Sequence, residues 1–140
     1  MATGSLYRFG VSLEKELIDR FDEAITQRKY ANRSEAIRDL IRDSLVQRQW
    51  AENDEVAGAI TLLYDHHAHG LSARLMHIEH DFTNVIVSSQ HIHLDHDNCL
   101  EIVAVKGRAR RVRKLSCTLK AIKGIKHVTL NTTATGRTLK

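Results

Sequence analysis

The 140-residue chain contains no proline, only two cysteines and no long apolar segment. No apolar run approaches the ~18 residues that a membrane-spanning helix requires. The first five residues, Met1–Ser5, lack the basic segment and apolar core of a secretory signal peptide. Two cysteines do not make a disulfide framework, so we expect a soluble protein in a reducing cytoplasm, with no membrane partner.

Motifs that are typical of enzymes are also missing. The sequence has neither a glycine-rich phosphate-binding loop nor a Gly-x-Ser-x-Gly nucleophile motif. Cys99 lies among histidines, which could suggest a cysteine nucleophile, but the spacing of these residues fits metal ligation better. We therefore expect that the chain is not an enzyme and takes no small organic substrate.

Charge is distributed unevenly along the chain. Residues 1–50 carry nine Lys/Arg and eight Asp/Glu, residues 51–105 carry one Arg and nine acids, and residues 106–140 carry eleven basic residues and no acid. These segments have charges of +1, −8 and +11, which sum to the net +4 of the chain. Eight of the nine histidines lie in the acidic segment, which favours a metal cation there. We interpret the basic segment as a solvated helix face and tail.

Residues 7–13 predict one short β-strand. The apolar residues Tyr7, Phe9, Val11 and Leu13 alternate with polar or small ones, which is strand periodicity. A lone strand cannot satisfy its backbone hydrogen bonds, and no second strand follows nearby. We therefore expect a two-fold-related copy of the chain to supply the partner strand.

Two helices are predicted after this strand. Residues 14–29 place four apolar side chains on one face at helical spacing. These are Leu17, Ile18, Phe21 and Ile25. The second helix begins at a capping box formed by Asn32 and Glu35 and runs to about Trp50. Fifty residues are too few to bury a good core alone, so we expect an intertwined dimer.

Residues 51–55 form a polar stretch that predicts a linker between a first domain, residues 1–50, and a second domain, residues 56–130. In the second domain, hydrophobic periodicity predicts strands over 56–64, 84–93, 99–105 and 125–130, with helices over 71–80 and 108–122. Gly107 is expected to end the third strand, and Cys117 to be a buried small apolar residue. The order βαββαβ is a ferredoxin-like arrangement in an α+β protein. Residues 131–140 are expected to be a disordered tail.

The sequence His91-Ile92-His93, followed by Cys99, predicts a metal site. Residues two apart on a strand point to the same face, so the two imidazoles project side by side. A turn could fold the Cys99 thiol back beside them. Imidazole with thiolate suits a borderline-soft transition metal better than calcium or magnesium. Three ligands leave a fourth position open.

The fourth ligand and the metal stay open on spacing alone. The candidate histidines are His66, His67, His69, His77, His80 and His96. His77 and His80 lie near the end of the helix predicted over 71–80, so either could reach the site of a neighbouring subunit. Cysteine with three histidines fits tetrahedral zinc as well as square-planar nickel or copper.

The first domain has the features of a β-ribbon DNA reader. Two paired strands form a ribbon that fits the major groove. Arg8, Gly10 and Ser12 would lie on its outer face, where Arg8 can bond guanine bidentately and Gly10 allows the backbone to approach. Asn32, Arg33 and Ser34 lie at the amide end of the second helix, which is an anion site suited to a backbone phosphate.

Five stretches of the sequence together resemble the nickel-responsive transcriptional regulators, a family of ribbon-helix-helix repressors. The resemblance covers residues 8–130, and the combination of a ribbon-helix-helix start with His-x-His and Cys-Leu-Glu is specific. The stretches are Arg8–Leu13, Asn32–Asp39, Tyr64–His66, His91–His93 and Asp97–Glu101.

The resemblance implies a homotetramer in which four ACT-type metal-binding domains carry two ribbon-helix-helix dimers. It also implies operator double-stranded DNA as a partner and one square-planar Ni²⁺ per subunit. The implied ligands are His91, His93 and Cys99 of one subunit with His80 of the facing subunit. By the same resemblance, Tyr64 and Glu101 support the ligands, His66 belongs to a secondary metal position, and Glu35 and Asp39 bind a cation where the two domains join.

We therefore expect a nickel-responsive, DNA-binding repressor that controls nickel uptake or nickel-linked genes. One alternative is a ribbon-helix-helix repressor that senses copper, zinc, cobalt or a small molecule. The alternative from another class is a metal-storage or metal-delivery protein, which would show no salt-dependent binding to duplex DNA.

Overall fold

The structure is a computed structural model that describes residues 4–140. The chain divides into two compact units, with the boundary between Leu45 and Val46 and the second unit extending to Thr138. The elements are α1 (Lys15–Gln27), α2 (Arg33–Ala51), β1 (Glu55–Asp65), α3 (Leu71–Asp81), β2 (Ile86–His93), β3 (Asn98–Arg108), α4 (Ala109–Lys120) and β4 (Ile125–Thr133). No helix among the described residues has the length and apolar content needed to cross a membrane.

The first unit contains two helices preceded by an irregular segment. The predicted strand over residues 7–13 is not formed in the single chain, and Tyr7, Phe9 and Val11 are more than 60% exposed. Strand geometry requires a hydrogen-bonding neighbour, which one chain does not provide here. The strand therefore stays a prediction for the assembled protein.

The start of α2 is capped by Asn32, as predicted. The Glu35 backbone N–H donates to Asn32 Oδ1 at 2.9 Å. The Glu35 carboxylate instead accepts from Arg38 at 2.5 Å, so the return bond of a full capping box is replaced by an i,i+3 ion pair. The helix continues to Ala51 and β1 begins at Glu55, so the segment between them is shorter than the 51–55 linker inferred from sequence.

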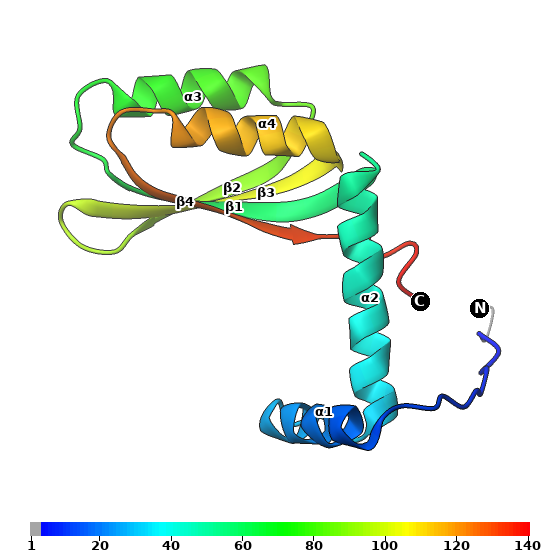
Figure 1. Ribbon diagram of the computed structural model, residues 1–140. Helices are drawn as coiled ribbons and strands as arrows, with labels where there is room; N and C mark the ends of the chain where they lie inside the picture. The colour runs from blue at the N-terminus through cyan, green and yellow to red at the C-terminus, as the bar shows by residue number, and fades with distance from the viewer. Residues whose placement is uncertain (1–3) are drawn as a thin grey trace. The chain divides into compact units, whose positions relative to one another are not determined.

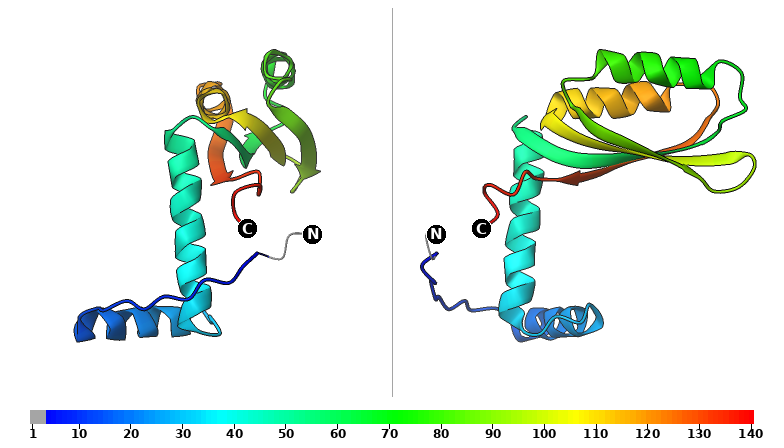
Figure 2. Two further views of the ribbon diagram at one scale, coloured as in Figure 1. Left: turned by 90° about the vertical axis from the view of Figure 1, so that its right-hand side faces the viewer. Right: turned by 180° about the vertical axis from the view of Figure 1, so that it is seen from behind.

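The second unit is a four-stranded antiparallel sheet covered on one face by two helices. The strand order is β2-β3-β1-β4, so β1 and β3 are central and β2 and β4 are the edges. Figure 1 shows α3 and α4 on the same face of the sheet, and the end-on view of Figure 2 shows them side by side. This is the predicted βαββαβ order.

The core of the second unit lies between the sheet and the two helices. Alternate residues of β1 and β3 are buried, as the strand periodicity predicts. Helix α4 contributes residues at positions i, i+3, i+4 and i+7, which make up one helix face. The largest fully buried side chains of this core are Ile60, Leu62, Leu71, Leu115, Leu119, Val56, Val103, Val112 and Cys99.

Three sequence predictions for this unit were wrong in detail. Strand β3 does not stop at Gly107 but runs to Arg108, because Gly107 pairs with Val56 and its missing side chain leaves room for Val85. Strand β4 runs to Thr133, so residues 131–133 are not part of a tail. Cys117 is exposed, because the buried face of α4 passes through Ser116 instead.

The end of α2 and the last residues of the chain also make specific contacts in this unit. The Trp50 indole N–H donates to the Thr133 carbonyl at 2.8 Å, and Gln49 Nε2 donates to the Thr138 hydroxyl at 2.5 Å. Trp50 is 4% exposed. The C-terminal segment thus has side-chain contacts as far as Thr138, which differs from the disordered tail expected over 131–140.

Candidate metal centre and DNA-binding segment

The register of the β2–β3 hairpin brings His93 and Cys99, two of the predicted ligands, together, whereas His91 belongs to none of the close groups of metal-type ligands within residues 4–140. His93 pairs with Cys99, and His91 pairs with Glu101 two residues further along β3. The turn is held by Asp95, whose Oδ1 accepts bonds from the backbone N–H groups of Asp97 and Asn98. The pKa of the Asp95 carboxyl is lowered, first by a hydrogen bond from the Asn98 side chain and then by these two backbone bonds. This turn places the thiol beside the imidazole of His93, as the spacing predicted.

Two imidazoles contact the Cys99 thiol directly. Cys99 Sγ lies 3.2 Å from His66 Nδ1 and 3.3 Å from His93 Nδ1. The three ligand atoms lie within 4.8 Å of one another. Burial raises the pKa of the Cys99 thiol, and the nearby carboxylates of Asp65, Asp95 and Glu101 raise it further. The negative surroundings that disfavour a free thiolate favour a bound cation.

His66 is the residue that sequence reasoning undervalued. It follows β1, whose Tyr64 pairs with Cys99, so the strand register carries the β1–α3 loop to the thiol. Burial lowers the pKa of His66, and the neighbouring histidines lower it further. The lowered pKa favours the neutral imidazole that a metal needs. The signal in the sequence is the position of His66 directly after a central strand, but strand pairing cannot be read from one strand alone.

His91 is oriented by a chain of hydrogen bonds rather than by the thiol. The buried Tyr64 hydroxyl donates to Glu101 Oε2 at 2.7 Å and lies 3.0 Å from His91 Nδ1. Burial is the main cause that raises the pKa of Tyr64, and Glu101 raises it further, so the hydroxyl keeps its single proton. Because that proton is donated to Glu101, His91 Nδ1 must supply the proton of the second bond. The lone pair of His91 is then on Nε2, free for a metal.

His91 and His93 lie side by side, with ring centroids 5.0 Å apart, as expected for residues two apart on a strand. His80 is exposed on α3 and belongs to none of the groups of metal-type ligands found in residues 4–140. Among these residues, two further groups lie close to the first, Asp65 with His66 and His67, and His67 with His96 and Asp97.

The residues predicted to read bases lie in the irregular segment before α1. Arg8, Gly10 and Ser12 are all exposed, and a side chain added at Gly10 would meet no atom within 4 Å. This leaves the segment accessible for strand pairing and for close approach of a ligand.

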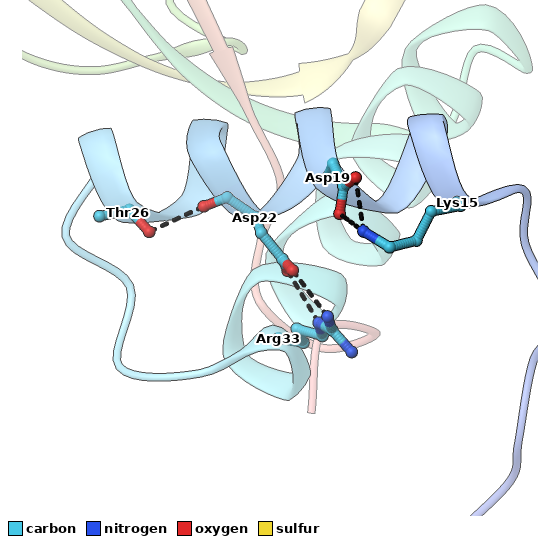
Figure 3. Close-up of polar contacts among 5 residues, drawn as sticks. All are labelled: Lys15, Asp19, Asp22, Thr26 and Arg33. Atoms are coloured by element: carbon cyan, nitrogen blue, oxygen red, sulfur yellow. Dashed lines mark hydrogen bonds and ion pairs between the residues drawn. The ribbon is translucent and has the colours of Figure 1, made fainter.

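Two of the three residues predicted to bind phosphate at the start of α2 already have partners within the first unit. Arg33 makes a double ion pair with Asp22 of α1, with N–O distances of 2.8 and 2.6 Å (Figure 3). This pairing lowers the pKa of the Asp22 carboxyl. The Arg33 side chain therefore joins the two helices, while Asn32 caps α2 and Ser34 is exposed.

Glu35 and Asp39, for which the resemblance implies a cation site, have partners of their own. Glu35 pairs with Arg38, while Asp39 accepts a bond from the Tyr30 hydroxyl at 3.0 Å and lies 3.5 Å from Arg42. Both carboxylates therefore already have hydrogen-bonding or charged partners within the first unit.

Comparisons with known proteins show the family to which the chain belongs. Residues 7–48 match the model of the ribbon-helix-helix proteins of the copG family, and residues 57–133 match the model of the NikR C terminal nickel binding domain. A protein of Syntrophus aciditrophicus named "Putative nickel-responsive regulator" is 57% identical over 94% of this chain and 96% of its own length. The chain belongs to the nickel-responsive regulator family.

Other regulators of this family are similar to the chain over nearly their whole length. A relative of the same name from Chlorobium phaeobacteroides is 55% identical over 90% of the chain and 94% of its own length. One from Nitratidesulfovibrio vulgaris is 51% identical over 97% of the chain and 99% of its own length. The predicted α+β architecture, with a ribbon-helix-helix part followed by a metal-binding domain, is thereby confirmed, and the family is one of transcriptional regulators rather than enzymes.

Proposed function

We propose that this regulator is a nickel-responsive, DNA-binding transcriptional repressor that acts in the cytoplasm on genes for nickel uptake or nickel use. The observation that carries the proposal is the buried Cys99 thiol with two imidazoles around it, on a chain that also has a ribbon-helix-helix segment. Storage or delivery of a metal requires only the first of these features.

One nickel ion per subunit would be held by His91, His93 and Cys99, with His80 of a second copy as the fourth donor. Nickel supplies a divalent charge that favours the thiolate over the thiol. The hydrogen bonds of Tyr64 and Glu101 support His91 as a ligand, because they leave its Nε2 without a proton. Glu101 would thus act on the metal through Tyr64 and His91.

The close contact of His66 with Cys99 makes His66 the competitor of His80 for the fourth position. We propose a secondary role for His66, because its imidazole comes from the same chain and would not link metal binding to assembly. A ligand from a second copy does provide that link, and assembly is what a DNA-binding regulator must control.

The proposed assembly is a homotetramer made of two ribbon-helix-helix dimers on a core of four metal-binding domains. Arg8, Gly10 and Ser12 would contact bases through the paired strands, and Asn32, Arg33 and Ser34 would lie near the phosphates. Arg33 would hold α1 against α2 through Asp22 and so position the ribbon. Glu35 and Asp39 remain candidates for a cation in the DNA-bound form.

Nickel can favour DNA binding only if it binds more tightly to the arrangement that binds DNA. We expect operator duplex to tighten nickel binding by the same factor by which nickel tightens operator binding. Calorimetric titration of the full chain with nickel, with and without a duplex selected from a randomised library, measures both sides of this linkage. Unchanged nickel affinity in the presence of the bound duplex would refute the proposed function.

Single substitutions test the proposed donors. Cys99→Ala and His93→Ala should abolish the thiolate-to-nickel absorption bands, and His80→Ala should do the same although His80 lies outside the cluster. His69→Ala, which removes an exposed histidine outside all the ligand groups, is the matched control and should keep the bands. Loss of the bands in His66→Ala with retention in His80→Ala would assign the fourth position to His66.

A further inference from the structure

Helix α4 presents a set of basic side chains that no other part of the described chain neutralises. Its buried face contains Ala109, Val112, Leu115, Ser116 and Leu119, and the opposite face contains Arg110, Arg113, Lys114 and Lys120, which are all exposed. We refer to these four residues as the α4 basic face. Residues 106–140 contain no acid that could pair with them.

The α4 basic face has no carboxylate partner from elsewhere within residues 4–140 either. The ion pairs of the described chain include none of these four residues. Arg111, by contrast, is turned toward α3, where it donates to the Asp81 carbonyl at 2.9 Å and lies over the Phe82 ring. Arg111 is thus bound to groups of α3 and its C-terminal end, whereas the four residues of the α4 basic face point outward without a carboxylate partner.

Retaining these charges carries an electrostatic cost. Arg110 lies three and four residues before Arg113 and Lys114, so the three cations are neighbours on the helix surface and repel one another. Arg110 also lies in the first turn of α4, where the helix dipole disfavours a positive charge. Both unfavourable effects are relieved if the face meets a polyanion.

We propose that the α4 basic face binds phosphates of duplex DNA beside the operator, as a second, sequence-independent contact of the same protein. The inference rests on the proposed function, because the ribbon-helix-helix segment must first bring DNA to the protein. A bound duplex then presents its flanking phosphates at high local concentration to any cationic surface tethered to it. The contact would add affinity and salt dependence without adding base preference.

The test removes three charges and keeps the fold. The variant Arg110→Gln/Lys114→Gln/Lys120→Gln retains helix-forming side chains and leaves Arg113, whose guanidinium lies 5.4 Å from the centre of the buried Trp50 ring. The probe is a duplex selected from a randomised library with nickel present, prepared with and without flanking base pairs. Affinity is measured by fluorescence anisotropy over a series of salt concentrations.

We expect the variant to bind the flanked duplex roughly tenfold or more weakly, with the salt slope reduced by about 0.9 for each phosphate that the variant no longer neutralises. The short duplex should be bound alike by variant and parent. The matched control Lys126→Gln/Arg137→Gln/Lys140→Gln removes the same charge from exposed positions outside α4 that likewise form no ion pair within residues 4–140, and it should keep the parental slope. An equal decrease in the control, or parental binding by the α4 variant, overturns the inference.

Two other results would refute either the α4 contact or the proposed function. If the α4 variant changes its oligomeric state in sedimentation, the face instead binds the acidic segment of another copy, and the DNA contact is refuted. If the parent itself shows no nickel-dependent binding of the selected duplex, the proposed function fails, which this comparison separates from failure of the α4 contact. The nickel absorption bands, expected unchanged in the α4 variant, show that its metal-binding domain is folded.

Discussion

At the scale of single residues, the candidate metal site includes polar groups that lie around the proposed ligands. Tyr64 links His91 to the buried Glu101, and the half-buried Glu79 lies near Glu101, with one carboxylate oxygen of Glu79 lacking a hydrogen-bond partner within the described structure. Burial raises the pKa of Glu79 to about 7, and the hydrogen bond and charge of Glu101 contribute in the same direction. The site therefore carries a carboxyl that is poorly accommodated when ionised.

Replacing Glu79 by Gln should stabilise the metal-free protein at neutral and alkaline pH. Because the pKa of Glu79 is higher in the folded than in the unfolded chain, the native state loses stability as the pH rises from the unfolded pKa of about 4.5 toward 7, and the loss is complete above that range. Glu79→Gln removes this loss, and we expect about 1–2 kcal/mol after allowing for solvent screening at a half-buried site.

The measurement is chemical denaturation in the presence of a chelator at several pH values. The gain from Glu79→Gln should be small near pH 4 and largest above pH 7. Asp97→Asn, which removes an exposed carboxylate from the β2–β3 hairpin, is the control and should show no such increase. A gain that does not vary with pH would mean that the carboxyl is not held at a raised pKa.

At the scale of elements, the first turn of α4 is capped by a residue distant in sequence. Asn53 Oδ1 accepts a hydrogen bond from the Arg110 backbone N–H at 2.8 Å, and the Asp54 carbonyl accepts from the Ala109 N–H at 3.0 Å. Asn53 has φ of 60°, a left-handed conformation that asparagine tolerates better than most residues. The residues between α2 and β1 therefore form a cap rather than a free linker.

Substitution of Asn53 separates its two contributions. Asn53→Gly keeps the backbone conformation and removes the cap, so the free energy of unfolding should fall by about 1 kcal/mol. Asn53→Ala also strains the left-handed backbone and should cost about 2 kcal/mol in total. Denaturation followed by circular dichroism gives both values, and Asn53→Asp, which keeps the acceptor oxygen, should stay close to the parent. Equal stability of the Gly and Ala variants would contradict the contribution of the backbone.

At the scale of the whole molecule, the first unit leaves apolar surface uncovered. Helix α1 has no buried residue, and a groove of about 470 Å³ opens between the segment before α1, α1 itself and α2. The groove is lined by Val11, Leu13, Leu17, Ile18, Phe21, Arg33, Ile37 and Leu40. We expect a second copy to cover this surface, because an apolar groove of this kind is unfavourable in water.

Leu40→Ala tests this expectation. Leu40 is 51% exposed in the single chain, so its truncation would cost little if the chain acted alone. If a second copy covers it, the loss should be about 2–5 kcal/mol per subunit, as for a core leucine. Analytical ultracentrifugation over a concentration series should show dissociation of the variant at higher concentration than the parent. Gln47→Ala, an exposed position on the same helix outside the groove, should show no shift.

Apart from the strand predicted over residues 7–13, the secondary structure followed from local patterns to within a few residues. The helix stripes, the alternating strands and the Asn32 cap all depend on neighbours within about four residues, which a sequence displays directly. The predicted ends of β3 and β4 were wrong because each end depends on a distant contact, and Cys117 was expected to be buried although the buried face of α4 passes through Ser116. Gly107 continues a strand because Val85 fills the space beside it, and Thr133 is held by Trp50.

The sequence alone determined the order of elements, the division of charge and the candidate ligands His91, His93 and Cys99, because these depend on residue identity and local spacing. Only the tertiary structure decided that His66 contacts the thiol, that Tyr64 and Glu101 set the tautomer of His91, and that Asn53 caps α4. Those contacts follow from strand pairing and helix packing, which bring together groups separated by 25 to 60 residues or so. Such pairings depend on the register of the sheet, which no single segment of the chain specifies by itself.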